Sequence, residues 1–498
     1  MSLLDTVAGA KAVDGHRPWP RAVVDDAGWR QAIDRLAAGA WTLSGLWGDI
    51  DAVHMAVIGD GGDIAVLTYQ CRDRRFPSVG ARHPPAIRLE RAILSLFGYE
   101  PVGAPDTRPW LDHGVWGVAH PVGDRSASPT PYTFLPVEGD GLHQVPVGPV
   151  HAGIIEPGHF RFTANGEFVV RVEERLGYVH KGIERLMAGA TIKLAAQLAG
   201  RTSGDSTVAY ASAFARAVEA ATQSSPPLRA VYLRALMAEL ERLANHFGDI
   251  GAICNDASFA LMHAQTGILR ERVLRVAEAC FGHRLMMDLI APGGVSRDLN
   301  ADGEALIRAL ITELRTRFPR LVELYDNTAS LQDRTVTTGI VKPEYAKQFG
   351  AGGYVGRAAG RNVDARRTPG YAPYDELKFE VPVLEAGDVN ARIWIRIREV
   401  EQSLSLIVQV LDYLPQGDVR TSIAVDGECE GMAYAEAFRG DVLVWVRLDA
   451  QGRVARCHLR DASWFQWPLL EAAIENNIIA DFPLCNKSFN CSYSGHDL

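Results

Sequence analysis

The sequence has no uncharged run of about eighteen apolar residues, which is close to the length that a helix needs to cross a bilayer. We therefore expect no membrane span in these 498 residues, and a partner has to hold the protein if it works at a membrane. An excess of basic charge is also absent, since 51 Lys and Arg residues stand against 60 Asp and Glu residues. Phosphate binding needs an excess of Lys and Arg, so this balance argues against nucleic acid as a partner.

Cysteine is scarce, because the chain has only seven cysteines and they are scattered along it. An odd count in a chain of this size indicates reduced thiols in the cytoplasm. Cys485 and Cys491 are neighbours in the sequence, but their spacing fits no familiar metal loop and no second pair accompanies them. We therefore expect that these cysteines form no metal site.

Nucleotide-binding motifs are missing as well. The glycine-rich segment 350–361 contains no G-x-x-x-x-G-K-[ST] and follows no expected strand. No G-x-G-x-x-G unit lies within a strand–helix–strand frame. NADH, if it is used at all, would therefore be oxidised on another chain.

The length predicts more than one domain, and a long stretch rich in Pro and Gly divides the chain near residue 140. Before this stretch, apolar runs flank a glycine-rich turn at 59–63, as in a β-hairpin. A segment with helical spacing of apolar residues then ends at Gly98, a residue type common at C-caps. We expect a small α/β domain with its connector at 1–140, with strands at 41–50, 54–58 and 64–69, a helix at 86–98 and a connector at 101–149.

After residue 171, apolar residues recur every three or four positions over long segments. Long helices with short breaks predict a bundle, and two alternating runs near the end predict a small antiparallel sheet. The expected fold class is α+β, with a mainly helical second domain at 141–498. The expected helices are 183–200, 204–222, 227–254, 258–283, 301–326 and 389–412, and the expected strands are 442–448 and 454–459.

Several sequence blocks carry a family resemblance. In the segment 83–121 they are Leu89-Glu-Arg-Ala-Ile-Leu-Ser-Leu-Phe-Gly98 and Gly103-Ala-Pro-Asp-Thr-Arg108. Six further blocks follow in order: Gly148-Pro-Val-His151, Gly177-Tyr-Val-His180-Lys-Gly-Ile-Glu184, Glu241-Arg-Leu-Ala-Asn245-His246, Pro292-Gly-Gly-Val295, Gly387-Asp-Val-Asn-Ala-Arg392 and Glu436-Ala-Phe-Arg439-Gly. The first set resembles the 30-kDa subunit of respiratory complex I. The second resembles the complex I 49-kDa subunit and, more closely, the large subunit of group 4 [NiFe]-hydrogenases and formate hydrogenlyase.

The resemblance implies a metal-binding frame at two places in this chain. Residues 201–206 (RTSGDS) have the frame of R-x-C-G-x-C, and residues 492–498 (SYSGHDL) have that of C-x-x-C-T-D-R. In nickel–iron hydrogenases these two cysteine pairs hold the metals, because soft thiolates suit nickel and iron. Here the four ligand positions are occupied by Ser203, Ser206, Ser492 and Gly495.

A nickel–iron centre is therefore not expected, since serine hydroxyls cannot replace thiolates and glycine offers no ligand. A register shift of one residue in the tail would place Cys491 and Ser494 at the two positions, which still leaves a single thiolate. We expect Ser203, Ser206 and Ser492 to line an emptied cofactor cavity. The alternative is that they are ordinary loop residues.

The other known use of this scaffold is a quinone pocket. The resemblance places the quinone-binding tyrosine at Gly204 and the quinone-binding histidine at Ile155 or Glu156, so neither ligand is present. The cavity itself is still expected, and a quinone stays a candidate ligand. The glycines of 350–361 are explained by the resemblance as a flexible loop above it.

Glu156 is the first catalytic candidate. The resemblance implies that a glutamate here passes protons to and from the metal site. A carboxyl on the rim of a largely apolar cavity would have its pKa raised by desolvation, which favours proton relay. The alternative is a carboxylate that is paired with an arginine.

Four further candidates come from the same motifs. Arg439 matches the hydrogenase arginine that overhangs the active site. Asp205 and His496 lie inside the two altered motifs, where they could restore polar function as a catalytic and a cofactor-binding residue. His151 lies in the first family motif and is the last catalytic candidate. The alternative for each is a structural role, because a histidine in such a place often orients a loop.

The resemblance implies a subunit of a membrane-associated complex related to energy-converting hydrogenases and NADH:quinone oxidoreductase. Its metal-free cavity would serve redox-linked proton transfer or the reduction of a quinone-like acceptor. The expected partners are a small iron–sulfur subunit that carries the Fe–S cluster and antiporter-like membrane subunits, with the chain peripheral on the cytoplasmic side. One alternative is an active group 4 hydrogenase or formate hydrogenlyase large subunit. The other is a redox-inactive scaffold that couples the iron–sulfur subunit to a membrane ion-translocating arm.

Overall fold

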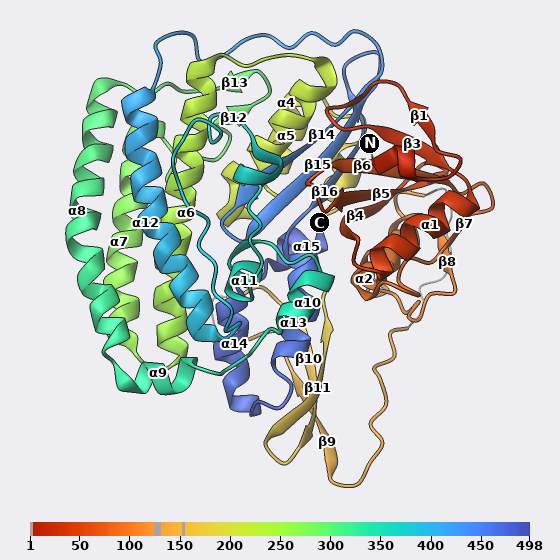
Figure 1. The fold of residues 1–498 in the computed structure, drawn as a ribbon, viewed down its shortest axis with the longest axis horizontal. Coiled ribbons are helices and arrows are strands. Elements are labelled where there is room, and N and C mark those ends of the chain that lie inside the picture. The colour runs from red at the N-terminus through yellow and green to blue at the C-terminus, as the bar shows by residue number, and fades with distance from the viewer. Residues whose placement is uncertain (1–2, 124–130, 152–154) are drawn as a thin grey trace.

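The structure is a computed structural model that describes residues 3–123, 131–151 and 155–498. It has the predicted α+β fold, with long helices gathered on one side and sheet-rich parts in the middle and on the other side (Figure 1). No helix of the described residues is long and apolar enough to cross a membrane.

The N-terminal part is built on a five-stranded sheet in the order β1-β3-β6-β5-β4. The predicted hairpin is confirmed, since β5 and β6 pair antiparallel with Ile58 opposite Ile64. The predicted C-cap is also confirmed, because Gly98 closes α2 with φ 72°. The elements are η1 (Leu3–Thr6), β1 (Lys11–Val13), β3 (Arg21–Val24), α1 (Asp26–Ala37), β4 (Trp41–Asp49), β5 (Ala52–Gly59), β6 (Ile64–Gln70), β7 (Arg75–Pro77), η2 (Pro84–Ala86), α2 (Ile87–Phe97) and β8 (Glu100–Val102).

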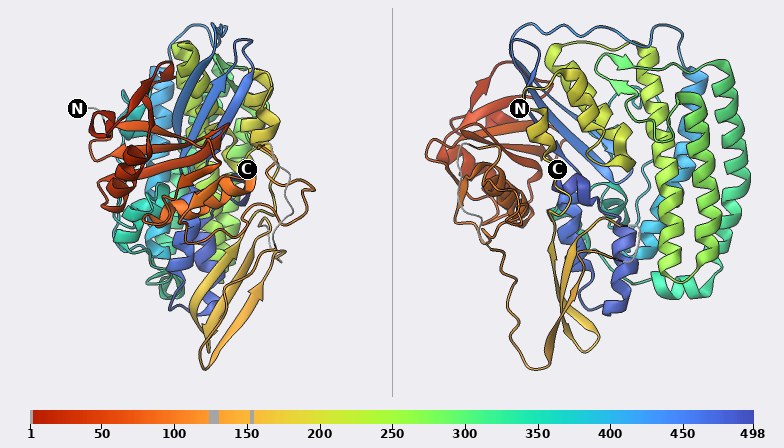
Figure 2. Two further views of the ribbon diagram at one scale, coloured as in Figure 1. Left: turned by 90° about the vertical axis from the view of Figure 1, so that its right-hand side faces the viewer. Right: turned by 180° about the vertical axis from the view of Figure 1, so that it is seen from behind.

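A long connector leads from this part to an antiparallel sheet that projects from the body of the molecule (Figure 2). The sheet has the order β11-β10-β9 and contains β9 (Leu142–Val147), β10 (His159–Asn165) and β11 (Phe168–Arg175). The connector predicted at 101–149 is therefore shorter, because β8 and β9 occupy its two ends. Residues 124–130 of the predicted connector lie outside the described residues.

The predicted bundle is present, and α6, α7, α8 and α12 stand side by side in it (Figure 1). The predicted helix 183–200 is two helices, because Gly189 with φ 79° interrupts it. The helices are α3 (Ile183–Met187), α4 (Ile192–Ala199), η3 (Gly204–Ser206), α5 (Thr207–Thr222), α6 (Leu228–Asp256), α7 (Ala260–Phe281), α8 (Ala301–Asp326), α9 (Ala329–Thr335), α10 (Pro343–Gln348), α11 (Gly353–Ala358), η4 (Arg366–Gly370) and α12 (Val389–Tyr413).

The flexible loop predicted at 350–361 is wrong, because the buried helix α11 occupies this segment. Gly353 has φ 59°, and a Cβ atom there would lie 1.9 Å from the Arg439 carbonyl oxygen. The glycine thus permits close packing of α11 against the turn that carries Arg439. The glycine is needed for close contact between the two backbones and does not make the segment mobile.

The predicted small antiparallel sheet is larger than expected, with the order β16-β15-β14-β2. The edge strand β2 belongs to the N-terminal part of the chain and pairs in parallel with β14. A short two-stranded ribbon, β12-β13, lies beside α5 and α6. The remaining elements are β2 (His16–Arg17), β12 (Ile290–Ala291), β13 (Gly294–Val295), β14 (Cys429–Ala437), β15 (Gly440–Leu448), β16 (Val454–Arg460), α13 (Ser463–Ala473), η5 (Ile479–Asp481), α14 (Phe482–Phe489) and α15 (Tyr493–Asp497).

Candidate functional site

The two altered motifs meet in the structure, although 289 positions separate Ser203 from Ser492. Their hydroxyl oxygens lie 2.9 Å apart. Ser492 is the N-cap of α15, where its Oγ accepts from the Gly495 backbone N–H at 2.9 Å. The Ser492 backbone N–H in turn donates to Ser463 Oγ at 2.8 Å, which fixes the tail against α13. Hydrogen bonds within the chain thus hold the two altered motifs together.

Asp205 and Arg439 form the charged centre of this region. The guanidinium of Arg439 donates to both carboxylate oxygens of Asp205, at 2.8 and 2.6 Å. The Ser203 hydroxyl donates to Asp205 Oδ1 at 2.8 Å, so the Ser492 hydroxyl must donate to Ser203. A directed hydrogen-bond chain therefore runs from the N-terminus of α15 to the Asp205 carboxylate.

The protonation states of this pair follow from its contacts. Burial alone would raise the pKa of Asp205, but the Arg439 charge and the hydroxyls of Ser203 and Ser206 hold it below its ordinary value. Burial would likewise lower the pKa of Arg439, but Asp205 keeps it well above the ordinary value. Both groups are therefore charged near neutral pH.

A cavity of about 290 Å³ opens beside this pair. Most of its side chains are polar, so the largely apolar cavity that the sequence predicts is wrong. The physical reason is that the emptied ligand positions hold serines, and the C-terminal turn of α14 adds Lys487 and Asn490. The lining residues are Ile155, Glu156, Ser203, Gly204, Asp205, Arg439, Lys487, Asn490, Cys491, Ser492, Tyr493 and Ser494.

Glu156 lies on the rim of the cavity and is exposed to solvent. Its Oε2 accepts from the backbone N–H of Ser494 at 3.0 Å, in the first turn of α15. No described residue forms an ion pair with it, so the alternative of an arginine partner is not observed. The structure thus brings together Glu156 with Asp205, Arg439, Ser203 and Ser492, whereas the predicted Ser206 is buried behind Asp205 and does not line the cavity.

His151 and His496 do not line this cavity. The Nε2 of His151 lies 2.7 Å from the Gly158 carbonyl oxygen, which ties together the two ends of the β9–β10 connection. His496 is fully buried, stacks on Trp464 with ring centroids 4.0 Å apart and lies 2.9 Å from Asp497 Oδ1. Burial lowers the pKa of His496, although Asp497 opposes this shift. Both contacts are those of a structural histidine.

Lys487 and Asn490 line the cavity but are absent from the sequence prediction. Asn490 adopts φ 44° at the C-cap of α14, its carbonyl oxygen accepts from Arg439 Nε, and its amide donates to Asp249 at 2.9 Å. Both residues lie in the tail segment that drew attention through its missing cysteines. The signal that could have found these two residues is a helix C-terminus at Asn490, because Asn is common as the residue that ends a helix.

The residues of the frame do not fit a nickel–iron centre. The hydroxyls of Ser203 and Ser492 are engaged with each other and with Asp205, and a side chain at Gly495 would lie 2.8 Å from Asp461 Oδ2. The neighbouring Cys491 has a pKa well above its ordinary value because it is buried, so its thiol is protonated. Among residues 3–123, 131–151 and 155–498, no three His, Cys, Asp or Glu side chains are grouped as metal ligands.

Comparison with known proteins shows to which family the chain belongs. Residues 258–427 match the family of the respiratory-chain NADH dehydrogenase 49 Kd subunit. Formate hydrogenlyase subunit 5 of Escherichia coli is 32% identical over 85% of this chain and 77% of its own length. A subunit of the NADH-quinone oxidoreductase of Desulfotalea psychrophila is 30% identical over 67% of this chain and 91% of its own length. A chain in the structure of the membrane-bound sulfane sulfur reductase, an archaeal respiratory membrane complex, is 25% identical, with a TM-score of 0.69 over 73% of this chain and 100% of its own. The chain therefore belongs to the family that unites group 4 hydrogenase large subunits with the 49-kDa subunit of respiratory complex I.

Proposed function

We propose that the chain is a subunit of a membrane-associated redox complex related to energy-converting hydrogenases, and that its cavity works without a metal of its own. The carrying observation is the meeting of Ser203 and Ser492 beside the Arg439–Asp205 pair. The two halves of the hydrogenase-like frame meet, and a polar hydrogen-bonded lining stands in place of the ligands. A frame that had merely decayed would have no reason to keep a directed chain of hydroxyls.

The charges of the cavity support a proton-carrying role for Glu156. Asp205 and Arg439 hold each other charged, so neither exchanges a proton readily near neutral pH. Glu156 reaches solvent and has no ion-pair partner among the described residues, so it can take up protons and deliver them to the cavity. Arg439 would stabilise negative charge that develops on a reduced acceptor, such as a quinone-like molecule.

The proposed partners are those that the family resemblance implies for a chain with this cavity. An iron–sulfur subunit would dock on the side of Ser203 and Ser492 and supply electrons from its cluster. Antiporter-like subunits would hold the chain at the cytoplasmic side of the membrane. The similarity to a chain of an archaeal respiratory membrane complex supports a place in a membrane-associated complex.

The test is replacement of Glu156 in the assembled complex. Glu156→Gln removes the carboxyl group but keeps the acceptor for Ser494, so the fold should be unaffected. We expect the turnover of the complex to fall by about 10²-fold or more, as is usual for loss of a general acid–base group. The matched control is Glu167→Gln, which changes an exposed glutamate on the projecting sheet and should leave turnover unchanged.

Two outcomes would replace the proposal. Stoichiometric nickel in the purified complex would establish an active group 4 hydrogenase. Full activity in Glu156→Gln and in Arg439→Lys would leave the redox-inactive scaffold as the function, since both variants disturb the cavity and spare the outer surfaces.

A further inference from the structure

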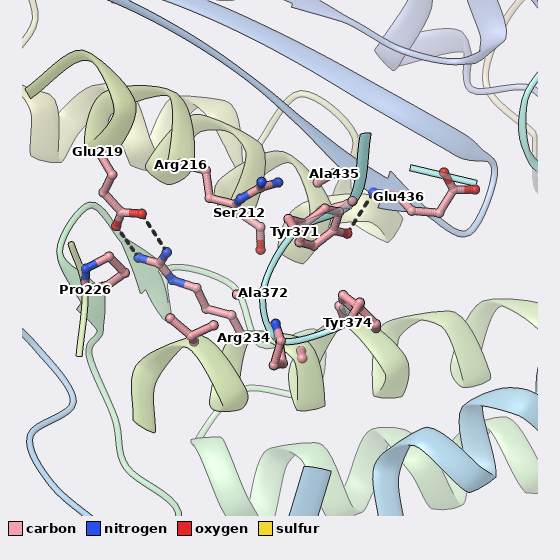
Figure 3. Close-up of a pocket in the computed structure, with 16 residues that line it drawn as sticks. Ser212, Arg216, Glu219, Pro226, Arg234, Tyr371, Ala372, Tyr374, Ala435 and Glu436 are labelled. Atoms are coloured by element: carbon pink, nitrogen blue, oxygen red, sulfur yellow. Dashed lines mark hydrogen bonds and ion pairs between the residues drawn. The ribbon is translucent and has the colours of Figure 1, made fainter. Parts of the chain in front are cut away.

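A second cavity, of about 310 Å³, lies between α5, α6 and the loop 370–374 (Figure 3). It shares no lining residue with the cavity at Ser203. Its volume is at the lower end of the range for small-molecule sites, which is about 300–1,000 Å³. The two cavities lie along one helix, because α5 begins directly after Ser206 and its later turns line the second cavity.

The space exists because two helices present small side chains at helical spacing. Ala209 on α5, and Ala235 and Ala238 on α6, face the gap, and Ala372 closes it from the loop. Larger side chains at these positions would fill it, as they do in an ordinary helix–helix contact. The walls of the cavity are therefore mainly apolar.

Two arginines and two glutamates line the cavity, and the carboxylate of Glu436 is paired with Arg357 at 3.0 Å. Glu219 and Arg234 neutralise each other through two hydrogen bonds of 2.6 and 3.0 Å (Figure 3). Arg216 forms no ion pair with any described residue. Its guanidinium stacks on the ring of Tyr371, with 3.9 Å between its Cζ and the ring centroid, and one of its nitrogens donates to the Tyr434 carbonyl oxygen. Arg216 is thus the charged side chain of this lining that has no ion-pair partner among the described residues.

A second polar group has no partner. Ser212, one turn before Arg216 on the same face of α5, is 8% exposed. Its Oγ is buried and makes no hydrogen bond to any described residue. Figure 3 shows this oxygen directed toward the gap between the two helices. A buried hydroxyl without a partner is costly, and a ligand oxygen would relieve the cost.

We propose that this cavity binds a small organic carboxylate, with its anionic end on Arg216 and Ser212 and its apolar part between the alanines. A planar guanidinium and a carboxylate form charge-assisted hydrogen bonds in pairs. One arginine without an ion-pair partner matches a single negative charge, whereas a phosphate dianion would leave an excess charge in an apolar site. A neutral molecule would leave Arg216 unpaired.

The test uses benzoate as the probe and benzamide as its neutral counterpart of the same shape, titrated into the full-length chain by calorimetry. Benzoate should bind at least tenfold more tightly than benzamide. Arg216→Gln should bring the two affinities together, since it removes the charge that separates them. The control Arg272→Gln changes an exposed arginine on α7 and should leave the preference unchanged.

A cavity-filling variant keeps the test decisive if Arg216→Gln does not fold. Ala238→Leu adds apolar volume to the wall and should lower the benzoate affinity at least tenfold. The proposal is overturned if benzoate fails to bind at millimolar concentration, if benzamide binds equally well, or if benzoate binds Ala238→Leu as it binds the unaltered chain.

Discussion

The pair of Arg439 and Asp205 gives the cavity its fixed charge, and removing one partner exposes its role. The Arg439 side chain is 5% exposed and that of Asp205 is 37% exposed. Asp205→Asn leaves a buried guanidinium without a counter-charge, so we expect a loss of about 2–3 kcal/mol in the free energy of unfolding, less than for a fully buried pair. Asp288→Asn breaks the exposed pair with Arg201 and should cost under about 1 kcal/mol.

This loss should depend on pH with a definite sign. The pKa of Asp205 is lower in the folded chain than its ordinary value of 3.8, so its contribution is fully present above pH 3.8. It disappears as pH falls through the lowered value. Urea unfolding of the unaltered chain and of Asp205→Asn, from neutral pH down to pH 3, measures the difference in their stability. An equal difference at all pH values would show that the charge of Asp205 is not responsible.

The fourth ligand position of the hydrogenase-like frame is closed by packing. A Cβ atom at Gly495 would lie 2.8 Å from Asp461 Oδ2, and this carboxylate is held in place by Tyr210. We expect Gly495→Ala to destabilise the chain by roughly 1–3 kcal/mol, because the neighbours cannot move away freely. In the other half of the frame, Gly204→Ala meets nothing within 4 Å and should change stability by less than about 0.5 kcal/mol. Thermal unfolding of both variants makes the comparison, and equal midpoints would contradict it.

At the scale of elements, the start of α5 depends on a carboxyl from α6. The backbone N–H groups of Val208 and Ala209 donate to Glu241 at 2.7 and 3.1 Å. Burial raises the pKa of Glu241 from 4.5 to about 8, although these two donors oppose the shift. The protonated form is therefore favoured in the folded chain.

The consequence is a slope of stability against pH. A raised carboxyl pKa contributes stability that is present below pH 4.5 and is lost as pH rises through about 8. Glu241→Gln should remove this slope, which amounts to on the order of 3–5 kcal/mol across the window. Chemical unfolding at pH 5 to 9 measures it, with exposed Glu278→Gln on α7 as the control. A slope that persists in Glu241→Gln would assign it to other groups.

Helices were predictable where local chemistry marks their ends. Asn300 and Asp388 cap α8 and α12 by accepting from backbone N–H groups three residues on, and both helices start as the sequence predicts. The strand β14 was not predicted, because Cys429–Ala437 mixes small, polar and apolar residues without clear alternation. It is a strand because it lies buried between β15 and α5. In such segments tertiary packing, not the local sequence pattern, determines whether a strand forms.

At the scale of the whole molecule, the sequence predicted part of the site. The frames at Ser203 and Ser492 could be paired through the family resemblance, and their hydroxyls do meet. The ion pair in the cavity could not be predicted from local pattern, because Asp205 and Arg439 lie 234 positions apart in the chain. His496 was misplaced for a similar reason, since nothing near it in sequence indicates the enclosing ring of Trp110.

The contacts between the N-terminal part and the rest predict how the whole chain unfolds. Trp47 is 2% exposed and lies against Trp445, with ring centroids 5.8 Å apart. Asp49 is held by both Arg447 nitrogens, and Ser44 Oγ lies 2.8 Å from the Tyr434 hydroxyl. Together with the pairing of β2 and β14, these contacts join the two parts through a buried surface.

We therefore expect residues 1–140 and 141–498 to unfold in one cooperative transition, although the sequence predicts them as separate domains. Trp47→Ala should lower the stability of both parts by about 3–5 kcal/mol, because the cavity it leaves faces both. Calorimetry should give one unfolding peak for the unaltered chain and one for Trp47→Ala. Hydrogen exchange should report the same loss of protection in β5 and in β15. Exposed Ile50→Ala is the control, since Ile50 is 70% exposed at the end of the same strand. Exchange that rises only in the N-terminal part of Trp47→Ala would show two independently stable domains, because a shared interface must transmit its loss to both sides.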